Sequence, residues 1–115
     1  MPILRDTVVI VLIGSRGRTL TMHATVFTYP LPAEHLENFV VGVNENSRAL
    51  PDAPGFQNAY WVYDRERSTV YVTILFDTAE QSQAAWEAAR PSVTEAFKQM
   101  GAVPDPRMCE VVHHV

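Results

Sequence analysis

The chain has 115 residues, of which 47% are hydrophobic, so it is long enough for one domain with its own core and too short for two. Nine basic against 13 acidic residues give a formal net charge of -4. This charge repels phosphate backbones and anionic membranes, so we expect neither nucleic acid nor a membrane as a partner.

Cys109 is the single cysteine, which excludes an intramolecular disulfide and any metal site built from several cysteines. Such sparse cysteine usage is typical of reducing compartments, and we expect the protein to be cytoplasmic.

Residues 1–21 contain an apolar run from Val8 to Ile13. The run is short for a signal peptide and lacks a following cleavage site, and it falls far below the roughly 20 apolar residues of a membrane span. We expect residues 1–21 to form an N-terminal extension, either a flexible arm or an extra strand, and residues 22–115 to form the folded domain.

Residues 20–29 alternate in the manner of a strand, with Thr25 and Phe27 on one face and Thr28 on the other. Pro30 and Pro32 end this strand. Apolar residues then recur at helical spacing and predict an amphipathic helix over residues 33–48.

Residues 56–64 and 69–76 are rich in aromatic and β-branched residues and predict a β-hairpin. Pairing Asp64 with Ser68 places Phe56, Asn58 and Tyr60 over Phe76, Ile74 and Val72 in turn, on the core side of the sheet. The opposite face then carries Trp61, Tyr63 and Tyr71, and we expect a second subunit to cover these aromatic side chains.

Thr78 and Gln81 have the spacing of a capping box at the start of a second helix. Pro91 predicts a break into segments 78–89 and 91–100, because proline lacks the amide hydrogen that continues a helix. The side chains expected to be buried are Trp86, Ala89, Val93, Phe97 and Met100. A last strand is predicted over residues 108–114.

This β-α-β-β-α-β order resembles the antibiotic biosynthesis monooxygenase-like family. The resemblance is carried by Met-His-Ala-Thr-Val-Phe at residues 22–27, Pro-Gly-Phe at residues 54–56 and Val-Thr-Ile-Leu-Phe-Asp at residues 72–77. It implies a ferredoxin-like α+β fold with an antiparallel sheet that pairs into a dimeric α/β barrel. It also implies small-molecule chemistry, since some members oxidise aromatic polyketides without metal or flavin, others degrade haem, and many have no assigned reaction.

Haem-degrading members of that family use an Asn on the first strand, a Trp at the end of the third strand and a His on the second helix. This chain has Thr28 and Phe76 at the first two places and no histidine in the second helix. Haem needs an axial ligand, so haem degradation is not expected and no cofactor is predicted.

Oxidation without a cofactor requires fewer specific side chains, because an electron-rich phenol or quinol reacts with dioxygen once it is deprotonated, oriented and desolvated. The candidate catalytic residues are Asn58, as a donor to a developing oxyanion, and His35, as a proton acceptor near neutral pH. The candidate substrate-binding residues are Thr28, Tyr60, Phe76 and Trp86. The alternative for Asn58 and Tyr60 is that both are satisfied polar residues at the edge of the core.

No metal site is predicted. His113 and His114 are neighbours on the last strand and therefore point to opposite faces. Cys109 and His113 share a face but lie about 13 Å apart at the rise of a strand.

Two hypotheses follow. The first is a homodimeric small-molecule binder with an apolar pocket between helices and sheet, acting as a cofactor-free monooxygenase on an aromatic substrate. The second is a non-catalytic dimeric module, which predicts a closed core without such a pocket.

Overall fold

The computed structural model describes residues 22–113, and their order of elements is the predicted β-α-β-β-α-β. The elements are β1 (His23–Pro30), η1 (Ala33–His35), α2 (Leu36–Asn46), η2 (Leu50–Asp52), β2 (Phe56–Asp64), β3 (Thr69–Phe76), α3 (Ala79–Gln99) and β4 (Arg107–Glu110). The predicted extension at residues 1–21 lies outside the described residues, as does His114. The predicted end of the last strand was wrong, because β4 ends at Glu110 and residues 111–113 are not in a strand. In residues 22–113, neither helix combines the length and the apolar content needed to cross a membrane.

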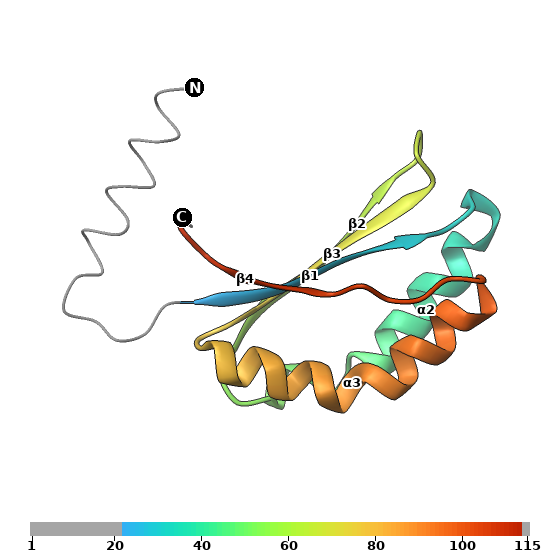
Figure 1. The fold of residues 1–115 in the computed structure, drawn as a ribbon. Helices are drawn as coiled ribbons and strands as arrows, with labels where there is room; N and C mark the ends of the chain where they lie inside the picture. The colour runs from blue at the N-terminus through green and yellow to red at the C-terminus, as the bar shows by residue number, and fades with distance from the viewer. Residues whose placement is uncertain (1–21, 114–115) are drawn as a thin grey trace, which may run out of the picture.

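The four strands form one antiparallel sheet in the order β2-β3-β1-β4, which confirms the ferredoxin-like α+β fold. Both helices lie on the same side of this sheet (Figure 1). We call that side the helix face; it carries Phe27 of β1 and Val72 of β3, which are partners in the register. The other side, the open face, carries Tyr60 and Val62 of β2 and Tyr71 of β3.

The core holds α3 against the helix face. Its buried members are Phe27, Leu31, Val70, Val72, Trp86 and Phe97. The Phe27 ring lies 5.9 Å from that of Trp86 and 6.0 Å from that of Phe97, measured between ring centroids. Burial of a large apolar side chain contributes about 1.5–3 kcal/mol, so these contacts dominate the attachment of α3 to the sheet.

The register of the β2–β3 hairpin differs from the prediction. Phe56 lies opposite Phe76 as expected, but a β-bulge between Phe56 and Asn58 shifts the rest of β2 by one residue. Because side chains alternate along a strand, this shift exchanges the two faces. The predicted faces were therefore wrong from residue 58 onward: Trp61 and Tyr63 lie on the helix face, and Asn58 and Tyr60 lie on the open face.

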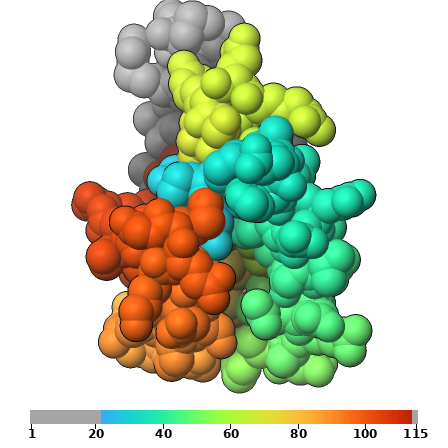
Figure 2. All heavy atoms as spheres, turned by 90° about the vertical axis from the view of Figure 1, so that its right-hand side faces the viewer, coloured from blue at the N-terminus to red at the C-terminus, as the bar shows by residue number. Residues whose placement is uncertain are grey.

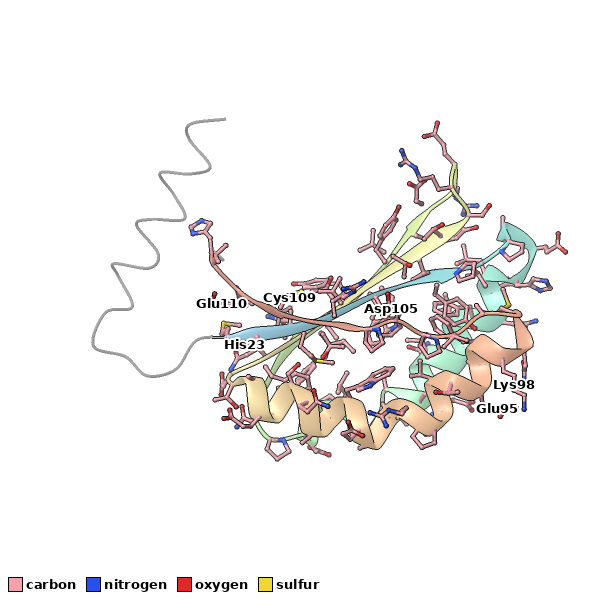
Figure 3. All side chains as sticks on the ribbon, in the orientation of Figure 1. His23, Glu95, Lys98, Asp105, Cys109 and Glu110 are labelled. Carbon is pink, nitrogen blue, oxygen red and sulfur yellow. The ribbon has the colours of Figure 1, made fainter. Side chains whose placement is uncertain are left out.

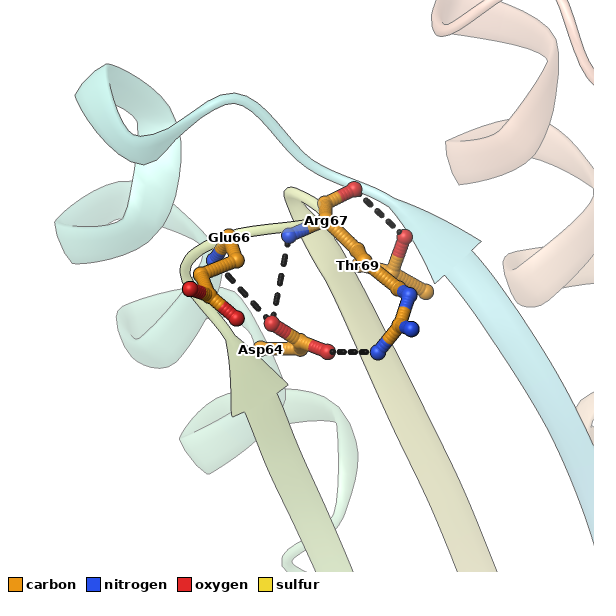
Figure 4. Close-up of polar contacts among 4 residues, drawn as sticks. All are labelled: Asp64, Glu66, Arg67 and Thr69. Atoms are coloured by element: carbon orange, nitrogen blue, oxygen red, sulfur yellow. Dashed lines mark hydrogen bonds and ion pairs between the residues drawn. The ribbon is translucent and has the colours of Figure 1, made fainter.

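The hairpin turn fixes the shifted register at its other end, where Asp64 pairs with Thr69. The Asp64 carboxylate accepts hydrogen bonds from the backbone N–H groups of Glu66, at 3.0 Å, and Arg67, at 3.1 Å (Figure 4). It also accepts one from the Arg67 guanidinium at 3.1 Å. These bonds from Arg67 hold the pKa of Asp64 below its usual value. Ser68 closes the turn at a φ of 49°, so the loop takes one residue more than predicted.

The second helix is continuous, so the predicted break at Pro91 was wrong. Proline removes one backbone hydrogen bond, but Pro91 is exposed and water can satisfy the carbonyl that loses its donor. Trp86 and Phe97, which are buried on either side of Pro91, hold both halves of the helix on the sheet. Figure 1 shows α3 bending along its middle.

The start of α3 carries the predicted capping box. The Thr78 hydroxyl accepts from the Gln81 backbone N–H at 3.2 Å, and the Gln81 side chain accepts from the Thr78 N–H at 3.1 Å. Gly55 lies against this cap with a φ of +78°, and a Cβ there would overlap the Gln81 side chain. Glycine is therefore favoured at this position, which directly precedes β2.

Candidate functional site

A cavity of about 620 Å³ lies between the helix face and the two helices. Strands β1, β2 and β3 form its floor, and α2, α3 and the segment after α2 form its walls. Figure 2 shows the hollow between α3, in orange, and α2 with the segment after it, in teal to green. Its volume is in the range of small-molecule sites.

Aromatic side chains surround the cavity. They come from all three floor strands and both helices: Phe27, Tyr29, Phe39, Trp61, Phe76, Trp86 and Phe97. Trp61 reaches the cavity because the bulge in β2 turns it to the helix face. Flat walls of this kind favour a planar aromatic ligand, since stacked and edge-to-face ring contacts add to the energy of burial.

Small residues keep the cavity open. On α3 these are Ala85, Ala88, Ala89, Ser92 and Ala96. In the middle of α2, Gly42 lines the cavity, and a Cβ built there would meet no atom within 4 Å. The space opposite Gly42 is therefore available to a ligand.

No charged side chain of the described residues lines the cavity. Its polar side chains are hydroxyls, amides and indoles: those of Thr25, Tyr29, Asn38, Asn46, Ser47, Trp61, Trp86, Ser92 and Gln99. The charged residues Glu95 and Lys98 of α3 point away from the sheet (Figure 3). Burying an unpaired charge is costly, so the lining favours an uncharged ligand.

A buried hydroxyl pair marks one part of the floor. Thr25 of β1 is 3% exposed, and Ser82 of α3 is fully buried. Their hydroxyl oxygens lie 2.7 Å apart, and each also approaches the sulfur of Met108 in β4, at 3.4 Å from Thr25 and 3.6 Å from Ser82. Thr25 lines the cavity, whereas Ser82 lies behind it.

Tyr29 supports the opposite part of the cavity. Its ring contacts Phe97 edge to face at 4.5 Å and Phe39 at 5.0 Å between centroids. Its hydroxyl donates to the carbonyl of Ala96 at 3.4 Å. Burial raises the pKa of the Tyr29 phenol, so the side chain remains neutral at physiological pH and contributes no base.

The structure brings together only part of the predicted site. Phe76 and Trp86 line the cavity. Thr28, Asn58 and Tyr60 lie on the open face, on the far side of the sheet. The bulge places Asn58 and Tyr60 there, and strand alternation places Thr28 on the face of β1 opposite Thr25 and Phe27.

His35 does not join the cavity either. It lies in η1, where its imidazole is exposed and Nε2 is 3.8 Å from a carboxylate oxygen of Glu34. The cavity walls thus contain neither of the two predicted catalytic residues.

The residues expected at a subunit contact are divided between the faces. Trp61 lines the cavity, and the Tyr63 hydroxyl donates to the carbonyl of Leu31 at 2.7 Å on the helix side. Tyr71 does lie on the open face and is 39% exposed.

Sequence reasoning missed several cavity residues. Thr25 could have been predicted as a cavity residue, because strand alternation already places it beside Phe27 on one face of β1. Trp61 could not have been predicted, because nothing in the alternation of β2 signals the bulge that turns it to the cavity.

Metal and haem do not fit the described residues. Within residues 22–113, no three His, Cys, Asp or Glu side chains come together as metal ligands. The cavity walls offer no histidine, cysteine or methionine to an iron atom, and the Tyr29 hydroxyl that lines the cavity is neutral and donates to the Ala96 carbonyl.

No protein-family model and no curated protein sequence matches the chain. Two solved structures share its fold. One is a protein of Nitrosomonas europaea named "Putative antibiotic biosynthesis monooxygenase", with a TM-score of 0.64 and 11% identity over 83% of this chain and 94% of that one. The other is a "putative monooxygenase" of Shewanella loihica PV-4, with a TM-score of 0.63 and 13% identity over 84% of this chain and 99% of that one. At these identities the likeness shows the fold, and it confirms the resemblance noted in the sequence at that level.

Proposed function

We propose that this protein binds an uncharged, planar aromatic molecule in the cavity and oxidises it with dioxygen, without a metal or an organic cofactor. The observation that carries the proposal is the cavity itself: about 620 Å³, walled by aromatic rings and lined by no charged side chain. Both structural neighbours are named putative monooxygenases, which supports the choice of reaction.

The substrate would supply all the electrons. In an anthrone-like compound, the CH₂ group that lies across the central ring from the carbonyl loses a proton to solvent and forms an electron-rich enolate that reacts with dioxygen. One oxygen atom becomes a new carbonyl and the other leaves with the two hydrogens as water. The protein then needs only to bind, orient and desolvate the reactant.

The cavity suits that limited role. Its polar groups can hold a neutral oxygen, and its aromatic walls exclude water from the reacting ring. Asn58 and His35 lie elsewhere, so neither the predicted oxyanion donor nor the predicted proton acceptor lines the cavity. A non-catalytic module, for which a closed core is expected, is the less favoured alternative.

The binding step can be tested with one cavity-filling variant. Gly42→Leu should place a side chain in the space opposite Gly42 and abolish the binding of 9-fluorenone, measured by isothermal titration calorimetry. The control Gly42→Ala adds only a methyl group and should retain binding. Unchanged affinity in Gly42→Leu would place the ligand outside the cavity.

The reaction is tested by incubating the protein with anthrones and hydroxynaphthalenes in air and following quinone formation. Native protein should exceed both the heat-denatured protein and the Gly42→Leu variant. Binding without any acceleration would reduce the protein to a carrier of aromatic molecules.

We also propose that a second copy of the chain covers the open face. Tyr60 and Val62 are 56% and 57% exposed there, and Val62 lies directly opposite Tyr71. Light scattering after size exclusion should give a dimer, and Val62→Lys should dissociate it. The control Val40→Lys, on exposed α2, should not. A native monomer at micromolar concentration would overturn this proposal.

A further inference from the structure

We infer that Thr25 orients the ligand by donating a hydrogen bond to a carbonyl or phenolic oxygen on the edge of its ring system. The inference rests on the proposed function, since it names the group in the cavity that would recognise such an oxygen. Its structural basis is the buried cluster of Thr25, Ser82 and Met108.

The cluster contains one hydroxyl hydrogen without a strong acceptor. Thr25 and Ser82 have two hydroxyl hydrogens between them, and one of these occupies the 2.7 Å contact between the two oxygens. The other is directed to the Met108 sulfur, at 3.4 Å from the Thr25 oxygen or 3.6 Å from the Ser82 oxygen. A thioether sulfur is a weak acceptor, so a ligand oxygen can replace it with a gain in hydrogen-bond energy.

The position of each hydroxyl assigns the roles. Thr25 lines the cavity and can reach a ligand, whereas Ser82 is fully buried and does not line it. With Ser82 donating to the Thr25 oxygen, the Thr25 hydrogen is free to turn from sulfur to ligand. A hydroxyl that accepts one hydrogen bond becomes a better donor in the next, so Ser82 acts as a positioning residue.

Two aromatic rings of the cavity wall lie next to the Thr25 hydroxyl in the fold. Phe27 follows Thr25 by two residues on the same face of β1, and Trp86 follows Ser82 by one turn on the same face of α3. Their rings lie 5.9 Å apart between centroids. A ring system lying along these walls brings an oxygen on its leading edge toward Thr25.

These features define a ligand class. It is an uncharged, fused-ring aromatic ketone, quinone or phenol, whose oxygen enters the cavity first. An aromatic hydrocarbon of the same shape would occupy the same space without this hydrogen bond.

The test compares 9-fluorenone with fluorene, which has a CH₂ group in place of the carbonyl. Affinities of the full chain for both compounds are measured by isothermal titration calorimetry. Thr25→Val should weaken fluorenone binding about fivefold, as expected for one neutral hydrogen bond, and should leave fluorene binding unchanged. Thr25→Ser keeps the hydroxyl and should retain the preference for fluorenone. Thr73→Val, a matched change on the open face of β3, should affect neither compound.

A second variant, Ser82→Ala, tests which hydroxyl donates to the ligand. It should weaken the binding of fluorenone less than Thr25→Val does. The reverse order would make Ser82 the donor and overturn the assignment. Equal losses for both compounds in Thr25→Val, or no loss for either, would also overturn it while leaving the cavity as the binding site. Failure of the native protein to bind either compound would refute the proposed function, and this inference with it.

Discussion

The two helices lie on the same face of the sheet, yet they are held in different ways. Helix α3 buries Ser82, Trp86 and Phe97 and begins at a complete capping box. Helix α2 has no buried residue, and no side chain caps its start. One helix builds the core, and the other mainly encloses the cavity.

This difference separates stability from binding. The attachment of α3 contributes to the free energy of unfolding whether or not a ligand is present. The inner side of α2, with Phe39 and Gly42, faces the cavity and would gain contacts when a ligand enters. We therefore expect substitutions in α3 to change stability first and substitutions in α2 to change affinity first.

The largest contrast should come from truncating one phenylalanine in each helix. Phe97 of α3 is 2% exposed, and Phe97→Ala should lower the free energy of unfolding by about 3–5 kcal/mol. Phe39 of α2 is only half-buried, so Phe39→Ala should cost about 1 kcal/mol. Urea denaturation measures both values. Equal losses would show that α2 belongs to the core as much as α3 does.

The next largest effect on the free energy of unfolding should arise at Gly55, which lies against the N-terminal cap of α3. Gly55→Ala should lower the free energy of unfolding by about 2 kcal/mol, because alanine strains a positive φ and its methyl group displaces the Gln81 side chain. Thr78→Ala, which removes the cap hydroxyl alone, should cost about 1 kcal/mol. A neutral Gly55→Ala in thermal unfolding would mean that the cap tolerates displacement.

A glycine in α2 should show the opposite sign. Gly42→Ala meets no atom within 4 Å, and alanine is favoured over glycine inside a helix. The variant should therefore raise the free energy of unfolding by up to about 1 kcal/mol, seen as a higher Tm. A lower Tm would indicate that α2 needs backbone freedom at Gly42.

The smallest effect should come from the hairpin tip, which belongs to neither helix. The pKa of Asp64 is lower in the folded chain than in the unfolded one, so the unfolded state binds more protons as the pH falls. The stabilisation is present above the unfolded pKa and is lost as the pH drops below about 4, through the lowered value.

Asp64→Asn keeps an acceptor for the turn and removes the charge. Its Tm should fall less steeply between about pH 4 and pH 2 than that of the native chain, and it should match the native slope near neutrality. Identical slopes throughout the acid range would show that the carboxylate does not contribute through its charge.

The local signals in the sequence predicted the order of the elements and the bounds of several of them. Alternation and turn residues predicted β2 and β3 with the bounds that the structure shows, and the Thr78–Gln81 spacing predicted the start of α3. The same reasoning failed at Pro91, because the burial of Trp86 and Phe97 outweighs the loss of one backbone hydrogen bond. Packing between distant segments decided that outcome, and no local pattern records it.

The candidate site was harder to predict. Phe76 and Trp86 were identified because large apolar residues on strands and helices tend to face the core. Asn58 and Tyr60 were misplaced by one unseen bulge, and the pairing of Thr25 with Ser82 depends on how α3 lies across β1. A cavity is the space that packing leaves empty, so it follows only from the assembled structure.

The β-bulge also bears on how the sequence can change length over evolutionary time. Gln57 is the additional residue of β2 at the bulge. Deleting it would straighten the strand and leave the orientation of every later side chain intact. Deleting any one residue from 59 to 63 would instead move the residues of β2 on one side of the deletion to the opposite face of the sheet. Gaps between related sequences in this strand are therefore expected to fall at position 57.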